Sequence, residues 1–123
     1  MANVGTTRYR GDQGERLVAS WLEGHGFVVL GRNVRLGLLE IDIVAREGSV
    51  IALVEVRTRS PSALTSGFSS VGPAKVLRLR RAGERLWNRK FRRDRSCSGL
   101  RFDLAAVTWT GHGASIEYVR GAF

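Results

Sequence analysis

The stretch that decides the fold is residues 39–57, which read LEIDIVAREGSVIALVEVR. Two runs of mostly apolar, β-branched residues flank the short turn signal at residues 47–49, a pattern typical of an antiparallel β-hairpin. Carboxylates interrupt both runs, which is unusual for strands of a hydrophobic sheet. The placement of these acids is therefore the feature from which function can be argued.

Side chains alternate between the two faces of a strand. We therefore expect Glu40 and Asp42 on one face of the first strand and Ile41 and Ile43 on the other. A two-residue loop would place Glu40 opposite Glu55, and a four-residue loop would place Asp42 there. In either register an acid faces an acid.

Like charges directly across a β-ladder destabilise a sheet, so these acids need a positive partner. A divalent metal ion is one candidate, because Mg²⁺ binds through one or two carboxylates and takes further ligands from water and phosphate oxygens. The alternative is a structural network in which Arg57 and Arg59 neutralise Asp42 and Glu55. The first interpretation outlines a site that cleaves phosphodiesters.

Glu15 is a further candidate for this site. The sequence predicts a helix from Asp12, as its N-cap, to about Gly24. Val18 and Leu22 follow Glu15 at helical spacing, which puts Glu15 on the inward face. A first-turn acid that interacts with the helix dipole is the equally open alternative.

The chain has 123 residues, which predicts one domain over residues 11–123 after a flexible basic tail at residues 1–10. No apolar run approaches the roughly 20 residues that span a bilayer. The N-terminus lacks the apolar core of a signal peptide, so we expect a cytoplasmic protein with no membrane partner. Cys97 is the only cysteine, which excludes an internal disulfide and a thiolate zinc site.

Basic residues outnumber acidic residues by 20 to 11, which gives a net charge of +9 and suits a polyanionic partner. A second helix is predicted from Pro73 to about Lys90, with one apolar and one basic side. A basic side that is merely solvated is the alternative. The residues predicted to contact nucleic acid are Lys75, Arg78, Arg81, Arg85, Arg89 and Arg59.

Further strands are predicted near residues 27–34, 100–110 and 115–119, with a long loop at residues 58–72. Asp103, within the fourth strand, is expected to be a hydrogen-bonded structural acid. The order of helix, three strands, helix and two strands predicts an α/β fold with a mixed five-stranded sheet flanked by helices.

Motifs from Gly11 to the C-terminus resemble the YraN-like family of small bacterial proteins. That family belongs to the restriction-endonuclease-like group named after its PD-(D/E)xK signature. In chain order the matching motifs are Gly14-Glu15, Arg32-Asn33 with Arg35, Glu40-Ile41-Asp42, Val54-Glu55-Val56-Arg57-Thr58-Arg59, Lys75, Arg101-Phe102-Asp103, and Ile116-Glu117-Tyr118-Val119-Arg120-Gly121-Ala122-Phe123. Together they are specific.

The resemblance implies a restriction-endonuclease-like core that hydrolyses phosphodiester bonds in DNA with Mg²⁺, or Mn²⁺ as an alternative. The metal would be held by Asp42, Glu55 and the main-chain carbonyl of Val56. Glu15 would face the same site, as a first-helix glutamate does in the related Holliday-junction resolvases. Arg57 stands where the signature has its catalytic lysine, and Lys75 is expected to contact the same phosphate.

Arginine stays protonated and cannot act as a general base, but it can place a water molecule and stabilise negative charge. We therefore expect a catalytic role for Arg57 in a slower nuclease. One alternative is a non-catalytic binder of DNA or RNA with a decayed site, and another is a module that binds an acidic protein. The sequence leaves open whether the DNA is branched, nicked or single-stranded, and whether the protein is a homodimer.

Overall fold

The structure is a computed structural model that describes residues 2–59 and 71–123, with side chains from residue 12 onward. Two helices, a short π-helical segment and five strands follow one another in the predicted order. The elements are α1 (Ala2–Gly24), β1 (Val28–Leu36), β2 (Leu39–Glu47), β3 (Val50–Arg59), α2 (Pro73–Leu86), η2 (Trp87–Phe91), β4 (Gly99–Thr110) and β5 (Gly113–Val119).

The five strands form one mixed sheet with the order β1-β2-β3-β4-β5. Neighbouring strands are antiparallel except β3 and β4, which run parallel because α2 connects them. This confirms the predicted α/β fold, and the arrangement is compatible with a restriction-endonuclease-like core.

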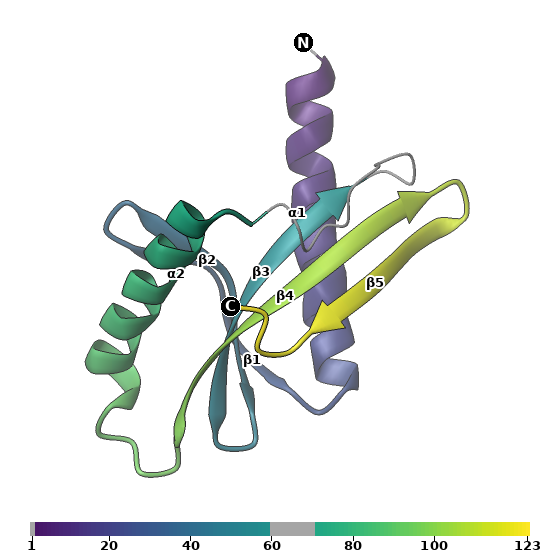
Figure 1. Ribbon diagram of the computed structural model, residues 1–123. Helices are drawn as coiled ribbons and strands as arrows, with labels where there is room; N and C mark the ends of the chain where they lie inside the picture. The colour runs from purple at the N-terminus through teal and green to yellow at the C-terminus, as the bar shows by residue number, and fades with distance from the viewer. Residues whose placement is uncertain (1, 60–70) are drawn as a thin grey trace.

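The helices cover opposite faces of the twisted sheet, with α1 behind it and α2 beside β1 and β2 at the left of Figure 1. Successive residues of β3 point to opposite faces of the sheet and so belong to two different hydrophobic cores. Ala52 and Val54 pack with Val18 and Leu22 of α1. On the other face, the apolar side of α2 packs on the remaining residues of the central strands, among them Ile51. The two cores fix both helices relative to β3, which carries Glu55.

Helix α2 presents the expected apolar side to the sheet, where Leu79, Ala82, Gly83 and Leu86 are buried. A Cβ atom at Gly83 would lie 2.7 Å from a side-chain atom of Leu53 and from one of Phe102. Glycine therefore allows the helix to approach the sheet closely. This approach brings the first turn of α2 to the end of β3.

Helix α1 begins at Ala2, ten residues before the predicted start. Asp12 consequently lies within the helix and is not its N-cap, so that prediction was wrong. The helix also extends through residues predicted to form a flexible tail, so a regular helical backbone replaces the expected irregular one. Local turn chemistry at Asp12 and Gly11 favoured a helix start that the longer helix overrides.

The β2–β3 hairpin is confirmed, but the predicted relation between loop length and register was wrong. A two-residue loop, Gly48 and Ser49, pairs Glu47 with Val50. Each step away from that pair goes back one residue along β2 and forward one residue along β3. The short loop therefore brings Asp42, not Glu40, to the level of Glu55.

The strict alternation predicted for β2 also fails near Asp42. Ile43 packs under α1, as a regular strand requires. Ile41 packs instead with the residues under α2, although it is two positions from Ile43. The two isoleucines were expected on one face, and the change of face falls at the carboxylate between them.

Asp103 has the structural role predicted for it and is fully buried. Its carboxylate accepts two hydrogen bonds from Arg101, at 2.8 and 2.9 Å, and one from the Tyr118 hydroxyl at 2.6 Å. The main-chain N–H of Gly121 donates a fourth bond at 2.9 Å. Burial, and after it the hydrogen bond to Asp103, raise the pKa of Tyr118. The network holds the C-terminal segment against β4.

Residues 58 and 59, predicted to belong to a loop at residues 58–72, lie in β3, which continues to Arg59. The rest of that prediction falls largely on residues 60–70, which lie outside the described residues. Within the described part of the chain, no helix is both long and apolar enough to cross a membrane.

Candidate active site

The carboxylates of Asp42 and Glu55 meet where the β2–β3 ladder ends. The last ladder pair is Ile43 with Val54. One residue further along, the main-chain N–H of Val56 donates to Oδ2 of Asp42 at 2.8 Å instead of continuing the ladder. Glu55 is only 5% exposed. The structure thus brings the two acids together at the point where the strands separate.

The environment of Asp42 disfavours its charged form. Burial is the largest cause, and the neighbouring charges of Glu55 and Glu15 add to it, so that the pKa of Asp42 rises from 3.8 to about 7. The hydrogen bond from Val56 and the positive charge of Lys75 lower this pKa but do not offset the rise. The burial of Asp42 therefore favours its neutral form, and a further cation beside it would favour the charged form.

Two cations lie beside Glu55. Nζ of Lys75, in the first turn of α2, is 2.7 Å from Oε1 of Glu55. Nε of Arg57 is 3.6 Å from the same oxygen, which is an ion pair and not a hydrogen bond. That Nε is buried and has no hydrogen-bond partner in the described residues. The lysine from the helix, rather than the arginine in the signature position, makes the short contact.

Glu15 reaches the same region from α1. A Cβ atom at Gly14 would lie 2.9 Å from Oγ1 of Thr58, so glycine lets α1 approach β3 closely. The Glu15 side chain is 18% exposed and lies 3.5 Å from Arg32. Burial raises the pKa of Glu15, against the lowering effect of Arg32. The inward orientation predicted from spacing is confirmed.

Asn33 appears in the sequence only as part of the motif Arg32-Asn33, and its contacts with the acids were not predicted. Its φ of 51° lies in the left-handed region, which asparagine tolerates better than most residues. With the side-chain nitrogen turned to satisfy both acceptors, it donates to Oε1 of Glu15 at 2.9 Å and Oε1 of Glu40 at 3.2 Å. A Gly-Arg-Asn sequence within a strand is the signal that could have indicated this bend.

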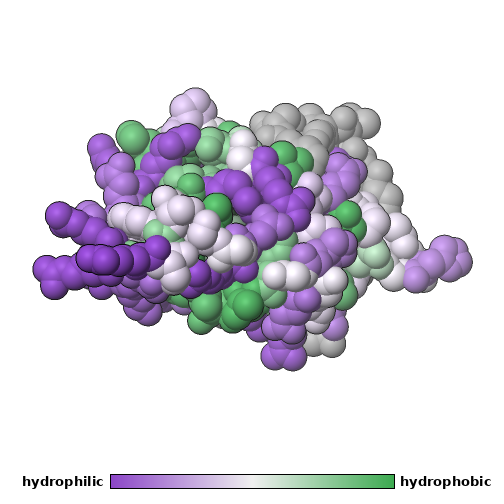
Figure 2. Space-filling view, turned by 90° about the horizontal axis from the view of Figure 1, so that it is seen from below, coloured by the Kyte–Doolittle hydropathy of each residue, from purple (hydrophilic) through white to green (hydrophobic). Residues whose placement is uncertain are grey.

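Helix α2 and the segment after it carry the predicted basic surface, defined here as Arg78, Arg81, Arg85 and Arg89. All four side chains are exposed. Figure 2 shows strongly hydrophilic side chains projecting from the side of the molecule that carries α2 in Figure 1. Because Lys75 begins the same helix, the basic surface leads directly to Glu55.

Arg59 lies apart from this surface. Its Nε donates to Oγ1 of Thr108 on β4 at 3.3 Å, and its guanidinium is 3.9 Å from Glu117 on β5. The structural network proposed for Asp42 and Glu55 is thus present in part, through Arg57. Arg59 instead interacts with the opposite edge of the sheet.

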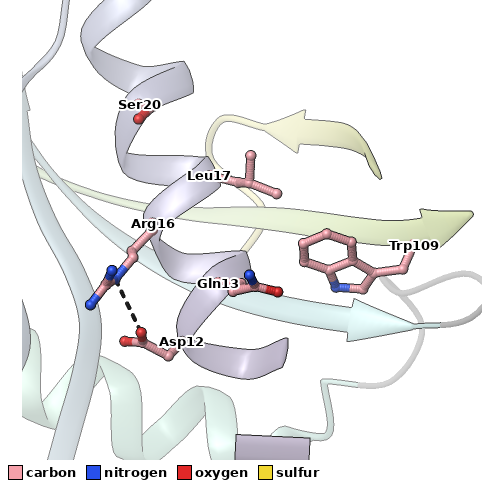
Figure 3. A pocket seen from close by; sticks show the side chains of 6 residues that line it. All are labelled: Asp12, Gln13, Arg16, Leu17, Ser20 and Trp109. Carbon is pink, nitrogen blue, oxygen red and sulfur yellow. Dashed lines mark ion pairs between the residues drawn. The ribbon is translucent and has the colours of Figure 1, made fainter. Parts of the chain in front are cut away.

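A groove of about 230 Å³ lies beside Lys75, which contacts Glu55. It is lined by Leu38, Leu39, Glu40, Lys75, Arg78 and Leu79. A larger hollow of about 660 Å³ lies along α1 and is closed on one side by Trp109 (Figure 3). Its lining includes the ion pair between Asp12 and Arg16 but none of the carboxylates predicted to act in catalysis. The groove of about 230 Å³ is not lined by Glu15, Asp42 or Glu55 either, but its lining residue Lys75 contacts Glu55.

The donor set of the site fits a hard divalent ion. Two carboxylates, from Asp42 and Glu55, and the carbonyl of Val56 are oxygen ligands, which suit Mg²⁺ or Mn²⁺ better than a structural zinc ion. Over the described ranges, no group of three or more His, Cys, Asp or Glu side chains is arranged to hold a metal ion. An ion here would therefore take its other ligands from water and from phosphate oxygens, as Mg²⁺ commonly does.

Comparison with protein families relates this site to known sequences. Residues 14–107, which include both acids and Lys75, match the family model described as "Uncharacterised protein family UPF0102". The chain belongs to this family. UPF0102 is the YraN family, so the resemblance drawn from the motifs is confirmed.

Relatives in UPF0102 match almost the whole chain. The UPF0102 protein of Sorangium cellulosum is 44% identical over 117 residues, which cover 94% of this chain and 81% of the relative. That of Moorella thermoacetica is 41% identical over 121 residues, covering 96% and 98%. That of Streptomyces coelicolor is 42% identical over 113 residues, covering 90% and 85%.

Proposed function

We propose that this UPF0102 protein is a metal-dependent nuclease that hydrolyses phosphodiester bonds in DNA. The observation that carries the proposal is the meeting of Asp42, Glu55 and Lys75 at the end of a basic surface. The raised pKa of Asp42, about 7, marks a buried carboxylate whose charged form a bound cation would stabilise. Perturbed carboxylates of this kind cluster at functional sites.

Asp42, Glu55 and the Val56 carbonyl would hold the metal ion. When bound, a divalent ion supplies Lewis acidity at the phosphate and lowers the pKa of a water molecule. The hydrogen bond from the Val56 N–H fixes Oδ2 of Asp42 and thereby orients the whole carboxylate. Such fixed orientation limits the reorganisation needed during the reaction.

Lys75 has the geometry of the catalytic cation in this proposal. Its ammonium group, 2.7 Å from Glu55, can donate to a phosphate oxygen that enters beside this carboxylate. In the reaction a water oxygen bonds to phosphorus while the bond from phosphorus to the leaving oxygen breaks. Water loses a proton to solvent and the leaving oxygen takes one up. Lys75 and Arg57 would offset the charge that develops on the phosphate.

The basic surface on α2 supports DNA as the substrate. Four exposed arginines on one side of the helix can follow a phosphate backbone without reading bases. Lys75 lies one turn before Arg78 in the same helix, so a bound backbone would lead to the carboxylates. The buried Nε of Arg57, which has no hydrogen-bond partner in the described residues, is a donor for a further phosphate oxygen or water.

A second function is favoured by one observation. Lys75 and Arg57 both lie within 4 Å of Oε1 of Glu55 and neutralise a carboxylate that the metal needs. A protein that binds nucleic acid without cleaving it would have the same basic surface with this ion pair as a purely structural contact. Its affinity would fall with salt and would not respond to Mg²⁺.

The experiment that separates the two functions is a cleavage assay. The protein is incubated with linear, nicked and branched DNA, with Mg²⁺ or with EDTA, beside the Asp42→Asn, Glu55→Gln double variant. The nuclease proposal predicts Mg²⁺-dependent cleavage of at least one substrate by the wild type and none by the double variant. Binding of DNA without cleavage in Mg²⁺ or Mn²⁺ would support the second function.

A further inference from the structure

The turn between β1 and β2 holds a leucine fully in solvent. Leu38 is 103% exposed, whereas Leu36, two positions earlier, is 3% exposed and belongs to the core under α2. Gly37 has a φ of 67°, which turns the chain sharply between them. Leu39 packs against the same core as Leu36. The turn is thus anchored on both sides and projects one large apolar side chain.

Exposed leucines occur singly on most proteins, so the exposure alone indicates little. The position of Leu38 is more specific, because it lines the groove of about 230 Å³ beside Lys75 and Arg78. Arg85 also reaches this turn, since its Nη1 lies 3.4 Å from where a Cβ of Gly37 would be. An apolar side chain therefore stands among cations, at the edge of the proposed active site.

We propose that Leu38 packs against an unstacked base of the DNA bound at this groove. The inference rests on the proposed function, because it takes the phosphates of the same DNA to lie on Lys75 and Arg78. Cations of this helix would hold the backbone, and the turn would then face the bases. Charge complementarity favours DNA as the occupant, since its phosphates can pair with the cations around Leu38. These cations are Lys75, Arg78 and Arg85.

The contact implies a substrate class. An apolar wedge that separates stacked bases in an intact duplex must overcome the stacking energy of that step. The cost is least where a base is already unpaired or mismatched. Leu38 should therefore favour DNA with an interrupted stack, such as a bulge, nick or branch, over a continuous duplex.

The test compares binding of two duplexes of equal length, one continuous and one with a single bulged nucleotide, in EDTA so that no cleavage occurs. We expect the wild type to bind the bulged DNA more tightly. Leu38→Ala should weaken binding of the bulged DNA by roughly three- to tenfold. The affinity for the continuous duplex and the melting temperature of the protein should stay unchanged. Leu77→Ala, at an exposed leucine of α2, is the matched control and should alter neither affinity.

Equal effects of Leu38→Ala on both duplexes, or no effect on either, would overturn the inference while leaving the nuclease proposal intact. Loss of a dimer in the Leu38→Ala variant, seen by light scattering, would overturn it by identifying a second copy as the occupant. Failure of the wild type to bind any DNA would overturn the proposed function together with this inference.

Discussion

Nζ of Lys75 lies 2.7 Å from Oε1 of Glu55, so helix α2 places a lysine beside the carboxylate that ends the buried part of β3. The PD-(D/E)xK signature, which the sequence resembles, has its lysine two residues after this acid, where this chain has Arg57. Arg57 is farther from Glu55, at 3.6 Å. We therefore expect Lys75, more than Arg57, to take the catalytic role predicted for the cation in the signature position.

Removing Lys75 should impair cleavage more than changing Arg57. We expect Lys75→Ala to lower the rate roughly 100-fold, the scale of losing one group that stabilises charge in the transition state. Arg57→Lys keeps a cation beside Glu55 and should have a much smaller effect. Single-turnover cleavage rates measure both, with Lys90→Ala as a control at an exposed lysine. An unchanged rate in Lys75→Ala would exclude a catalytic role for this lysine.

Stability should depend on pH through Asp42. Its pKa is about 7 in the folded protein and 3.8 without the fold, so between these values the folded state binds more protons than the unfolded state. The free energy of unfolding therefore falls as pH rises between these two values. Above pH 7 the loss is complete and amounts to about 4 kcal/mol. Asp42→Asn, which can still accept the Val56 hydrogen bond, should remove this loss.

Urea denaturation at pH 5 and pH 8 checks this prediction. The stability difference between Asp42→Asn and wild type should be larger at pH 8 than at pH 5. Mg²⁺ at pH 8 should stabilise the wild type and not the variant, because a bound ion supplies the charge that the carboxylate needs. A difference that is independent of pH would show that Asp42 titrates normally.

The basic surface should account for the salt dependence of DNA binding. Each phosphate contact contributes about −0.9 to the slope of log affinity against log salt for duplex DNA. Arg81→Ala should therefore reduce the magnitude of that slope by about 0.9. Arg16→Ala, at an exposed arginine of α1, removes the same charge and should leave the slope unchanged. Equal slopes for both variants would place the DNA elsewhere.

Asp103 should be essential for stability and not for chemistry. Asp103→Ala leaves Arg101 and Tyr118 without their buried partner, which typically costs about 3–5 kcal/mol. Glu23→Ala, at an exposed acid of α1, is the control. Denaturant titration of the two variants measures the difference. A small effect of Asp103→Ala would mean that the network does not hold the C-terminal segment.

Some of this structure could be read from the sequence because local patterns determine it. Alternating residues and a turn at Gly48 identify the β2–β3 hairpin, and helical spacing identifies the apolar side of α2. The buried, hydrogen-bonded state of Asp103 follows from the cost of an acid in an apolar strand. These features depend on neighbours in the chain, so periodicity and composition suffice to predict them.

Other features depend on packing between distant segments. The contact of Lys75 with Glu55 requires α2 to approach the sheet at Gly83, which no local pattern specifies. The amide of Asn33 bridges acids from α1 and β2, and this contact depends on how the two elements pack. The early start of α1 likewise overrides the turn signal at Asp12.

The central claim is that Asp42 and Glu55 capture one divalent ion at the end of the basic surface. Mn²⁺ binding, measured by isothermal titration calorimetry with and without a DNA duplex, tests it most directly. The account predicts one ion per chain in the wild type and none in the Asp42→Asn, Glu55→Gln variant, whose DNA affinity is retained. Equal Mn²⁺ binding by the two proteins, or no binding by the wild type even with DNA, would contradict it.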